Sequence, residues 1–306
     1  MTAAELPVRP AAGRLLILAA AVLWSSNGLF VKSPLFDDWP AETRGLLLAF
    51  WRALFASLAL VPAVRRPQFR WGLVPMALAF TAMSFAFLQS MTLGTAANAI
   101  WLQSTAPLWV FVFTLCIYRE PLHGRDLWPL AAGLAGTGLI LYFELGHSGV
   151  SGNSAMGAML GLASGIFYAF VVVSMRRLRE LGAAWLVAVN HLVSAVILAS
   201  FCLALGVQPH GWQWPALVLF GLGQMAIPYL LFARGLRHVS SQEGAAIALL
   251  EPVLSPLWVL LAWGERPAPW TIAGGLLILA GLALRYLLLA ARNGSRPKPL
   301  APPSSP

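Results

Sequence analysis

Apolar side chains occur along this chain in long runs that short polar segments interrupt. Ten windows of about 20 residues are apolar nearly throughout, and a helix of that length spans the roughly 30 Å hydrocarbon core of a bilayer. The windows are 13–32, 45–64, 73–91, 96–118, 127–144, 155–174, 184–205, 214–233, 244–263 and 269–289. The pattern therefore predicts an all-α integral membrane protein with ten transmembrane helices.

The composition narrows the class of protein further. The chain is 59% hydrophobic and only 10% charged, which leaves too little charge to solvate the surface of a soluble protein of this length. The net charge of +9 does not indicate nucleic-acid binding, because the basic residues form small groups between apolar windows rather than one continuous face. We expect a lipid bilayer around the protein and no nucleic acid among its partners.

The basic residues also predict the orientation. If the N-terminus is cytoplasmic, sixteen Lys and Arg fall on the cytoplasmic side, against three, Lys32, Arg44 and Arg266, on the opposite side. We therefore expect a multi-pass protein of the inner (plasma) membrane with both termini in the cytoplasm. Residues 1–12 are then a cytoplasmic N-terminal segment, and the Pro- and Ser-rich residues 290–306 a disordered cytoplasmic tail.

The two halves of the chain resemble each other. STAPLWVFVFTLCIYREPL (104–122) aligns with LLEPVLSPLWVLLAWGERP (249–267), so that Pro107 and Pro252 each stand 13 residues before a glutamate, Glu120 or Glu265. This predicts a first five-helix repeat at 13–144, a connecting loop at 145–154 and a second repeat at 155–289. Because five is odd, the second repeat enters the membrane from the opposite side, and such inverted repeats build the alternating gates of many secondary transporters.

These features together resemble the drug/metabolite transporter superfamily, EamA type. The resemblance rests on the five-plus-five arrangement, the proline-then-glutamate ends, Trp24 and Asn27 in WSSNGLFVK, and the segment WRALFASLAL in the second window. It covers about residues 13 to 289. It implies a bacterial inner-membrane carrier that exports amino acids and other small metabolites, usually by proton-linked or gradient-driven antiport, and it leaves the cargo open.

Motifs of catalysis are missing from the sequence. A membrane hydrolase needs a serine turn of the GxSxG kind with a histidine, a carboxylate pair or an HExxH zinc site, and none is present. Cys116 and Cys202 lie in apolar windows without partners at metal-ligand spacing. We expect no enzyme, no cofactor and no metal.

Glu251 is the acidic residue that lies deep in a predicted span. A charge at that depth costs about 3 kcal/mol, so it normally faces a cavity or a partner. One interpretation is functional: Glu251 takes up a proton during transport, or it binds the ammonium of a substrate. The other is structural: Glu251 pairs with Arg52 or hydrogen-bonds backbone that a proline has freed.

Two other charged or titratable residues are candidates for coupling. Arg52 lies about a third of the way into the second window, where it either attracts a carboxylate substrate or snorkels to the membrane interface. His191 occupies a similar place in the seventh window. A single histidine in an apolar helix is either a satisfied core group or part of a proton relay.

Prolines stand at matching positions in the fourth and ninth windows. Pro252 and Pro256 remove backbone donors from the ninth window, and Pro107 does so in the fourth. The matching positions favour a pair of functional hinges near the midplane, although a proline kink that only shapes packing remains open.

The remaining candidates concern the cargo. Aromatic and amide side chains with a few polar groups suit a small zwitterion or an aromatic metabolite better than a polyanion. The candidate substrate-binding residues are Trp24, Asn27, Trp101, Gln103, Tyr168, Gln224 and Glu251. We expect a secondary transporter that exports small metabolites, amino acids among them, by alternating access, with Glu251 as the hypothetical proton-coupling group. The alternatives are an uncoupled channel or facilitator and a membrane-embedded enzyme.

Overall fold

The computed structural model describes residues 10–64, 67–118, 127–146 and 152–294. Within these ranges the chain forms helices and no strand, as predicted. Nine helical stretches there are long and apolar enough to cross a membrane. They are Pro10–Val31, Ala41–Leu60, Leu73–Leu93, Leu127–Gly146, Asn153–Arg177, Ala183–Leu205, Gln213–Gly235, Glu243–Trp263 and Pro269–Leu287.

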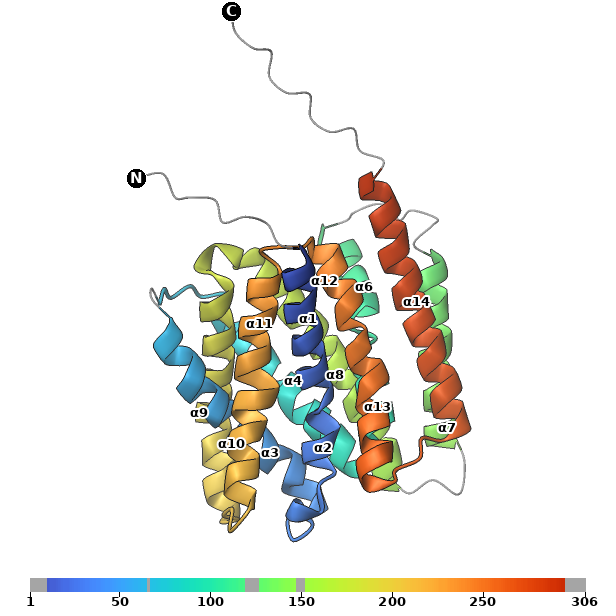
Figure 1. Ribbon diagram of the computed structural model, residues 1–306. Coiled ribbons are helices and arrows are strands. Elements are labelled where there is room, and N and C mark those ends of the chain that lie inside the picture. Colours follow the sequence, from blue (N-terminus) through green and yellow to red (C-terminus); the bar gives the residue numbers. More distant parts are fainter. Residues whose placement is uncertain (1–9, 65–66, 119–126, 147–151, 295–306) are drawn as a thin grey trace, which may run out of the picture.

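The helices stand roughly side by side in one bundle, with the start of α1 and the end of α14 on the same face (Figure 1). The first half contains α1 (Pro10–Ser25), α2 (Asn27–Val31), η1 (Pro34–Phe36), α3 (Ala41–Leu60), η2 (Val61–Ala63), α4 (Leu73–Leu93), α5 (Ala96–Gln103), α6 (Ala106–Tyr118) and α7 (Leu127–Gly146). The second half contains α8 (Gly152–Arg177), η4 (Arg179–Leu181), α9 (Ala183–Leu205), α10 (Gln213–Gly221), η5 (Leu222–Ala226), α11 (Ile227–Gly235), α12 (Ser241–Ala248), α13 (Leu250–Trp263) and α14 (Pro269–Gly294).

The fourth predicted span is where the structure differs from ten continuous helices. The window 96–118 is divided into α5 and α6 by a turn at Ser104 and Thr105, and neither piece alone is long enough to cross a bilayer. The ninth window, 244–263, is divided at Leu249 between α12 and α13. Pro107 and Pro252 stand in the first turn after each break, where the missing N–H is not needed by the helix. The breaks thus lie just before the prolines.

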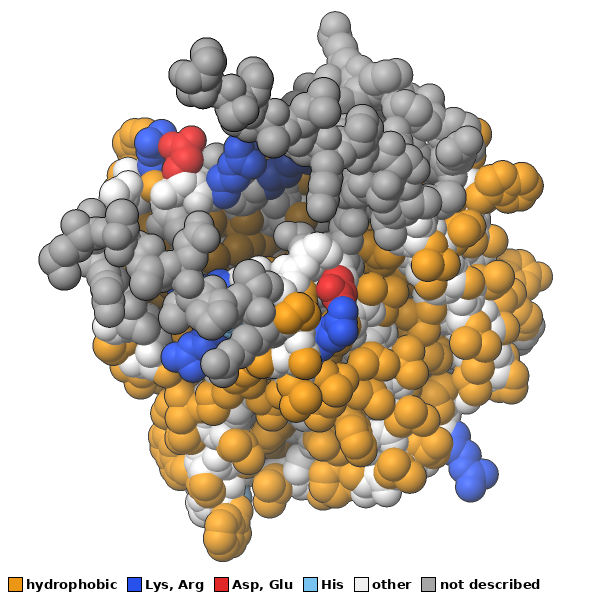
Figure 2. Space-filling view, turned by 45° about the horizontal axis from the view of Figure 1, so that its top comes forward, with side chains coloured by type: hydrophobic (Ala, Val, Ile, Leu, Met, Phe, Trp, Pro, Cys, Tyr) orange, Lys and Arg blue, Asp and Glu red, His pale blue; other side chains and the backbone are white. Residues whose placement is uncertain are grey.

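Apolar side chains cover much of the outside of the bundle. Leu261 is 76% exposed and Leu203 75%, and the lower part of Figure 2 is mostly hydrophobic surface. A soluble monomer rarely exposes so continuous an apolar surface, because each such side chain orders or excludes water. The exterior therefore has the chemistry of a protein that faces lipid.

Three glycines allow α8 to approach α4 and α5 closely. A Cβ atom on Gly157 would lie 2.8 Å from the backbone nitrogen of Gly94, and one on Gly165 would lie 2.9 Å from the carbonyl oxygen of Leu102. Gly161 faces Ser90 in the same way, at 2.9 Å from its hydroxyl. This strip of small residues therefore serves packing inside the bundle.

Some predicted boundaries shift at the ends of the chain. Helix α1 begins at Pro10, inside the predicted N-terminal segment, and α14 continues to Gly294, so residues 290–294 of the predicted disordered tail are helical. The predicted connection at 145–154 is shortened on both sides by α7 and α8. Glu120, one member of the repeated glutamate pair, lies outside the described residues.

Candidate functional site

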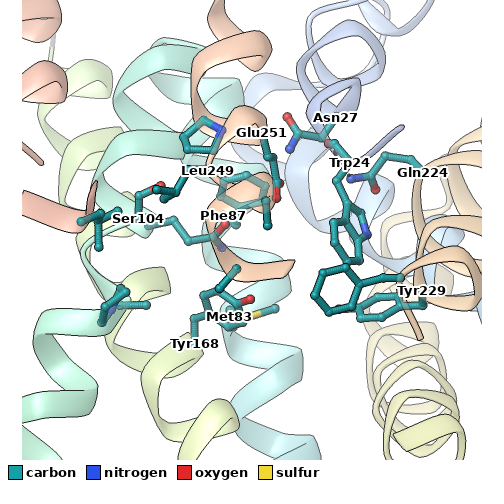
Figure 3. A pocket seen from close by; sticks show the side chains of 18 of the residues that line it. Trp24, Asn27, Met83, Phe87, Ser104, Tyr168, Gln224, Tyr229, Leu249 and Glu251 are labelled. Carbon is teal, nitrogen blue, oxygen red and sulfur yellow. Dashed lines mark hydrogen bonds between the residues drawn. The ribbon is translucent and has the colours of Figure 1, made fainter. Parts of the chain in front are cut away.

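A cavity of about 360 Å³ lies at the centre of the bundle, between elements of both halves. This volume is in the range of small-molecule sites. Its described lining residues are Trp24, Asn27, Arg52, Met83, Phe87, Gln103, Ser104, Ala106, Pro107, Tyr168, Gln224, Met225, Tyr229, Phe232, Ala245, Ala248, Leu249, Glu251, Pro252, Leu282 and Tyr286. Figure 3 shows Trp24, Gln224 and Tyr229 on one side and Ser104, Met83 and Tyr168 on the other.

The cavity extends toward the face of the bundle at which α1 begins and α14 ends. Ala245 lies near the start of α12 and Tyr286 near the end of α14, and both of these helix ends belong to that face (Figure 1). Figure 2 looks onto this face and shows a hollow between the described elements, with Lys and Arg side chains close to it. The described lining residues of the cavity therefore lie toward this face of the bundle.

Glu251 lies in the first turn of α13 and its side chain is partly exposed to the cavity. Within the described part of the chain its carboxylate accepts no hydrogen bond and forms no ion pair. The ion pair between Glu251 and Arg52, which was one of the structural interpretations, is therefore not formed.

Arg52, on α3, is 1% exposed and borders the same cavity. Its Nη2 donates to the Ser84 hydroxyl of α4 at 2.7 Å, and its guanidinium stacks 5.3 Å from the ring centre of Phe220 on α10. A second contact, from Nη1 to Gln224 Oε1, is long at 3.5 Å, and Nε has no partner. Arg52 thus does not snorkel to the interface; it is a buried cation without a carboxylate partner among the described residues.

The amide groups at the cavity are only partly satisfied. Asn27, at the start of α2, accepts a hydrogen bond from Ser255 through Oδ1 at 3.1 Å, whereas its Nδ2 has no partner. Gln224 donates to the Trp24 carbonyl at 3.1 Å. It lies in η5, a π-helical turn, and such turns occur frequently at functional sites because they re-aim side chains.

Aromatic rings form one wall of the cavity. The Trp24 ring meets Tyr229 edge to face at 5.2 Å and lies at the same distance from Phe232. These spacings are typical of favourable aromatic pairs. We call Trp24, Tyr229 and Phe232 the ring cluster.

The opposite end of the bundle is closed by a charged network. Lys32 Nζ lies 2.9 Å from Glu265 Oε2 and donates to the Gly94 carbonyl at 2.6 Å. Glu265 Oε1 accepts from the N–H of Ala96 at 2.8 Å, so the same carboxylate satisfies a free donor at the start of α5. We call these four residues the Lys32–Glu265 network; it joins the ends of α2, α4 and α13 to the start of α5.

The two broken helices are tied to other elements by carbonyls at their prolines. Pro256 has no N–H to offer the carbonyl of Pro252, four residues earlier, and the indole N–H of Trp101 donates to that oxygen at 2.9 Å. On the other side, Arg285 Nη1 donates to the Pro107 carbonyl at 2.5 Å. Side chains of the protein thus occupy both carbonyls.

The pattern of this chain matches one family model twice, over residues 11–142 and 155–287, and the model is that of the EamA-like transporter family. The chain belongs to the EamA-like transporter family. The two matches together cover most of the chain and show that this transporter is built from two copies of one unit.

Several proteins resemble this EamA-like transporter along much of its length. An uncharacterized transporter of Archaeoglobus fulgidus is 27% identical over 282 residues, covering 90% of this chain and 96% of that protein. The aromatic amino acid exporter YddG of Ancylobacter novellus is 24% identical and covers 67% of this chain and 71% of its own. One solved crystal structure, 23% identical, superposes with a TM-score of 0.63 over 94% of this chain and 99% of that one, and it shows the same fold.

The EamA-like transporter brings most of its sequence-predicted site residues to one place. Of the candidates, the cavity lining contains Trp24, Asn27, Arg52, Gln103, Pro107, Tyr168, Gln224, Glu251 and Pro252. Trp101 is instead 6% exposed and packs against Gly275, so it supports the wall without lining it. Pro256 lies inside α13, outside the lining.

His191 lies behind the cavity wall of this transporter. It is 1% exposed on α9, its ring lies 4.9 Å from Phe80 and 6.3 Å from Tyr229, and neither of its ring nitrogens has a partner. Its contacts are therefore those of a packed ring, and a relay through it would need water between it and the lining.

Some residues that line the cavity or hold its lining side chains could not be singled out from the sequence. Ser84 holds Arg52 and Phe232 completes the ring cluster, yet both are ordinary members of apolar windows. Phe220, which stacks on Arg52, gives no signal either. Only the three-dimensional approach of their helices gives these side chains a role.

Proposed function

We propose that this EamA-like transporter exports small metabolites, amino acids among them, from the cytoplasm by alternating access. The observation that carries the proposal is a central cavity that extends toward one face of the bundle while the Lys32–Glu265 network closes the opposite end. The cavity volume of about 360 Å³ accommodates a solute of amino-acid size.

The orientation follows from the basic residues. The basic residues at the face where α1 begins and α14 ends, such as Arg70, Arg176 and Arg234, outnumber those at the closed end, so the open face is the cytoplasmic one. The cavity as described is then loaded from the inner side of the plasma membrane. Rocking of the two inverted repeats would release the Lys32–Glu265 network and open the outer end.

The choice of amino acids has two supports. The lining combines aromatic rings with a small number of amide and charged groups, which suits a small molecule with an apolar part and polar ends. In addition, a relative of 24% identity is named an aromatic amino acid exporter. The trio Asn27, Tyr168 and Glu251 is part of this lining, and Trp101 supports it from behind.

Glu251 is the group that we propose couples transport to protons. Its carboxylate is accessible from the cavity and has no partner within the described residues, so a proton and a substrate ammonium can occupy it in turn. The breaks before Pro107 and Pro252 are the proposed hinges, since they divide the two helices that meet at the cavity.

Reconstitution into proteoliposomes tests the proposal. Vesicles loaded with labelled amino acids should show saturable efflux that depends on the protein and responds to an imposed proton gradient. Flux that neither saturates nor responds to the gradient would indicate an uncoupled channel, and absence of flux for all amino acids would contradict the proposal. The Glu251→Gln variant should transport without responding to pH, or not transport at all.

A further inference from the structure

The cavity contains two opposite charges that do not neutralise each other. Arg52 is the cation and Glu251 the anion among the described residues that line it, and neither forms an ion pair. A charge held away from water without a partner is destabilising by several kcal/mol, so such groups normally await a ligand or solvent. The two residues therefore point to a ligand that carries both signs.

We propose that Arg52 binds the carboxylate and Glu251 the ammonium of a zwitterionic α-amino acid, while the ring cluster takes an aromatic side chain. The inference rests on the proposed function and adds which residue recognises which end of the cargo. A simple organic anion would leave Glu251 without a partner, and a simple amine would leave Arg52 without one. Only a molecule with both groups satisfies the two charges together.

The surroundings of Arg52 hold its guanidinium in place for this task. Ser84 accepts one of its five N–H groups at 2.7 Å, and Phe220 supports its plane from a distance of 5.3 Å. The contact with Gln224 is 3.5 Å long, at the limit of a hydrogen bond, and Nε–H is unpartnered. A carboxylate that replaces the Gln224 contact gains a charge-assisted hydrogen bond from a group that is already oriented.

Glu251 approaches the cavity from the other half of the chain. It stands on α13, whereas Arg52 stands on α3, and the Trp101 bond to the adjacent Pro252 carbonyl fixes the start of α13. A ligand that contacts both charges thus bridges the two repeats. A molecule with a single charge engages one repeat and leaves the other unliganded.

The ring cluster supplies the apolar part of the site. Trp24 and Tyr229 meet edge to face at 5.2 Å, and Phe232 lies at 5.2 Å from Trp24 on the same wall. Gln224 links this wall to the charge site, because it contacts Arg52 and also donates to the Trp24 carbonyl. An aromatic ring attached to the carbon between the two charged groups is the side chain that this arrangement favours.

Binding of labelled L-phenylalanine to the purified full-length protein tests the inference. The competitors are phenethylamine, which lacks the carboxylate, 3-phenylpropionate, which lacks the ammonium, and L-alanine, which lacks the ring. We expect each to compete about tenfold more weakly than unlabelled phenylalanine, since each forfeits one charge-assisted bond or the ring contacts. Competition by phenethylamine or by 3-phenylpropionate as strong as that of unlabelled phenylalanine would overturn the inference.

Variants assign the two ends. Glu251→Gln should remove the disadvantage of 3-phenylpropionate, and Arg52→Gln that of phenethylamine, while Arg52→Lys should keep the preference for a carboxylate. Exposed Arg70→Gln and Glu180→Gln serve as matched controls and should leave all four affinities unchanged. A melting curve shows whether the Arg52→Gln variant is folded. If it is not folded, the binding results for Arg52→Lys and Glu251→Gln decide the assignment. Equal weakening of all competitors by Glu251→Gln would overturn the assignment.

The proposed function and the assignment of Arg52 and Glu251 to the two ends of the cargo are contradicted by different results. If no amino acid is transported by proteoliposomes, the proposed function is wrong and the inference falls with it. If amino acids are transported but phenylalanine is not bound, or its charged ends do not matter, the inference alone is wrong.

Discussion

Two pairs of opposite charges in this protein behave differently. At the closed end of the bundle Lys32 and Glu265 are 2.9 Å apart and both about one fifth exposed; Lys32 also donates to the Gly94 carbonyl, and Glu265 accepts from the Ala96 N–H. At the central cavity Arg52 and Glu251 face one space without pairing. The first pair holds four helix ends together, those of α2, α4, α5 and α13. The second pair leaves its charges available. We infer that in this fold the position of a charge relative to the cavity, more than its cost in lipid, decides its role.

The largest expected effect comes from removing the cavity carboxylate. Glu251→Gln should lower amino-acid efflux at limiting substrate by about ten- to a hundredfold, because a charge-assisted hydrogen bond contributes about 1.5–3 kcal/mol. If Glu251 also carries the coupling proton, the remaining flux no longer depends on pH. Initial rates in proteoliposomes at several pH values measure both effects, and wild-type rates with wild-type pH dependence would make Glu251 equivalent to a structural residue.

The next effect concerns the bond that holds Glu251 at the cavity. Trp101→Phe keeps the ring against Gly275 but leaves the buried Pro252 carbonyl without its donor. We expect a loss of about 1–3 kcal/mol in the free energy of unfolding, measured by denaturation in detergent. Trp263→Phe is the control, because Trp263 donates similarly to the Leu29 carbonyl but is 41% exposed. Equal losses in the two variants would show that burial of the carbonyl is unimportant.

A smaller effect is expected at the closed end. Lys32→Met or Glu265→Gln should favour opening of this end by about 1 kcal/mol, the upper range for a partly exposed ion pair, or about a fivefold change in population. A cysteine at the fully buried Ser255, in a Cys116→Ala and Cys202→Ala background, should then react faster with a membrane-impermeant thiol reagent from outside. Unchanged labelling in both variants would show that the Lys32–Glu265 network does not control the opening of this end.

The smallest effect sets the baseline for the comparison. Arg70 and Glu180 are 3.5 Å apart with side chains 61% and 72% exposed, so the pair is screened by solvent. Replacing either by Gln should change stability by less than about 0.5 kcal/mol and leave transport unaffected. A loss as large as that of Glu251→Gln would mean that charge in general, and not charge at the cavity, controls the assay.

The positions of the long helices could be predicted from the apolar windows alone. The window 184–205 became α9 (Ala183–Leu205), and 73–91 became α4 (Leu73–Leu93), because a run of apolar residues has one low-energy conformation in lipid. The sequence predicted that two helices are broken, but not at which residues the breaks lie. Pro107 and Pro252 marked the right windows, but the turns lie before them, since a proline is compatible with the first turn of a helix.

The sequence predicted which residues belong to the candidate site better than it predicted which residues contact each other there. Trp24, Gln224 and Glu251 were recognisable as polar or aromatic residues in apolar spans, and they do meet at the cavity. Trp101 was recognisable for the same reason, yet it lies behind the wall and bonds a freed carbonyl. The residue type indicates that a polar atom in a membrane span needs a partner, whereas the partner depends on which helix arrives beside it.

By itself, the sequence determined a multi-pass helical membrane protein with a repeated unit, because apolar length and the spacing of prolines and glutamates are local properties of the chain. The tertiary structure decided which charges pair. Arg52 contacts Ser84, 32 residues away in the sequence, and Gln224, 172 residues away, but it does not pair with Glu251. Lys32 forms an ion pair with Glu265. Such contacts depend on how helices from the two repeats cross. Charges interact strongly only over a few ångströms, so a shift of one helical turn can move a side chain away from its partner and leave it facing a cavity.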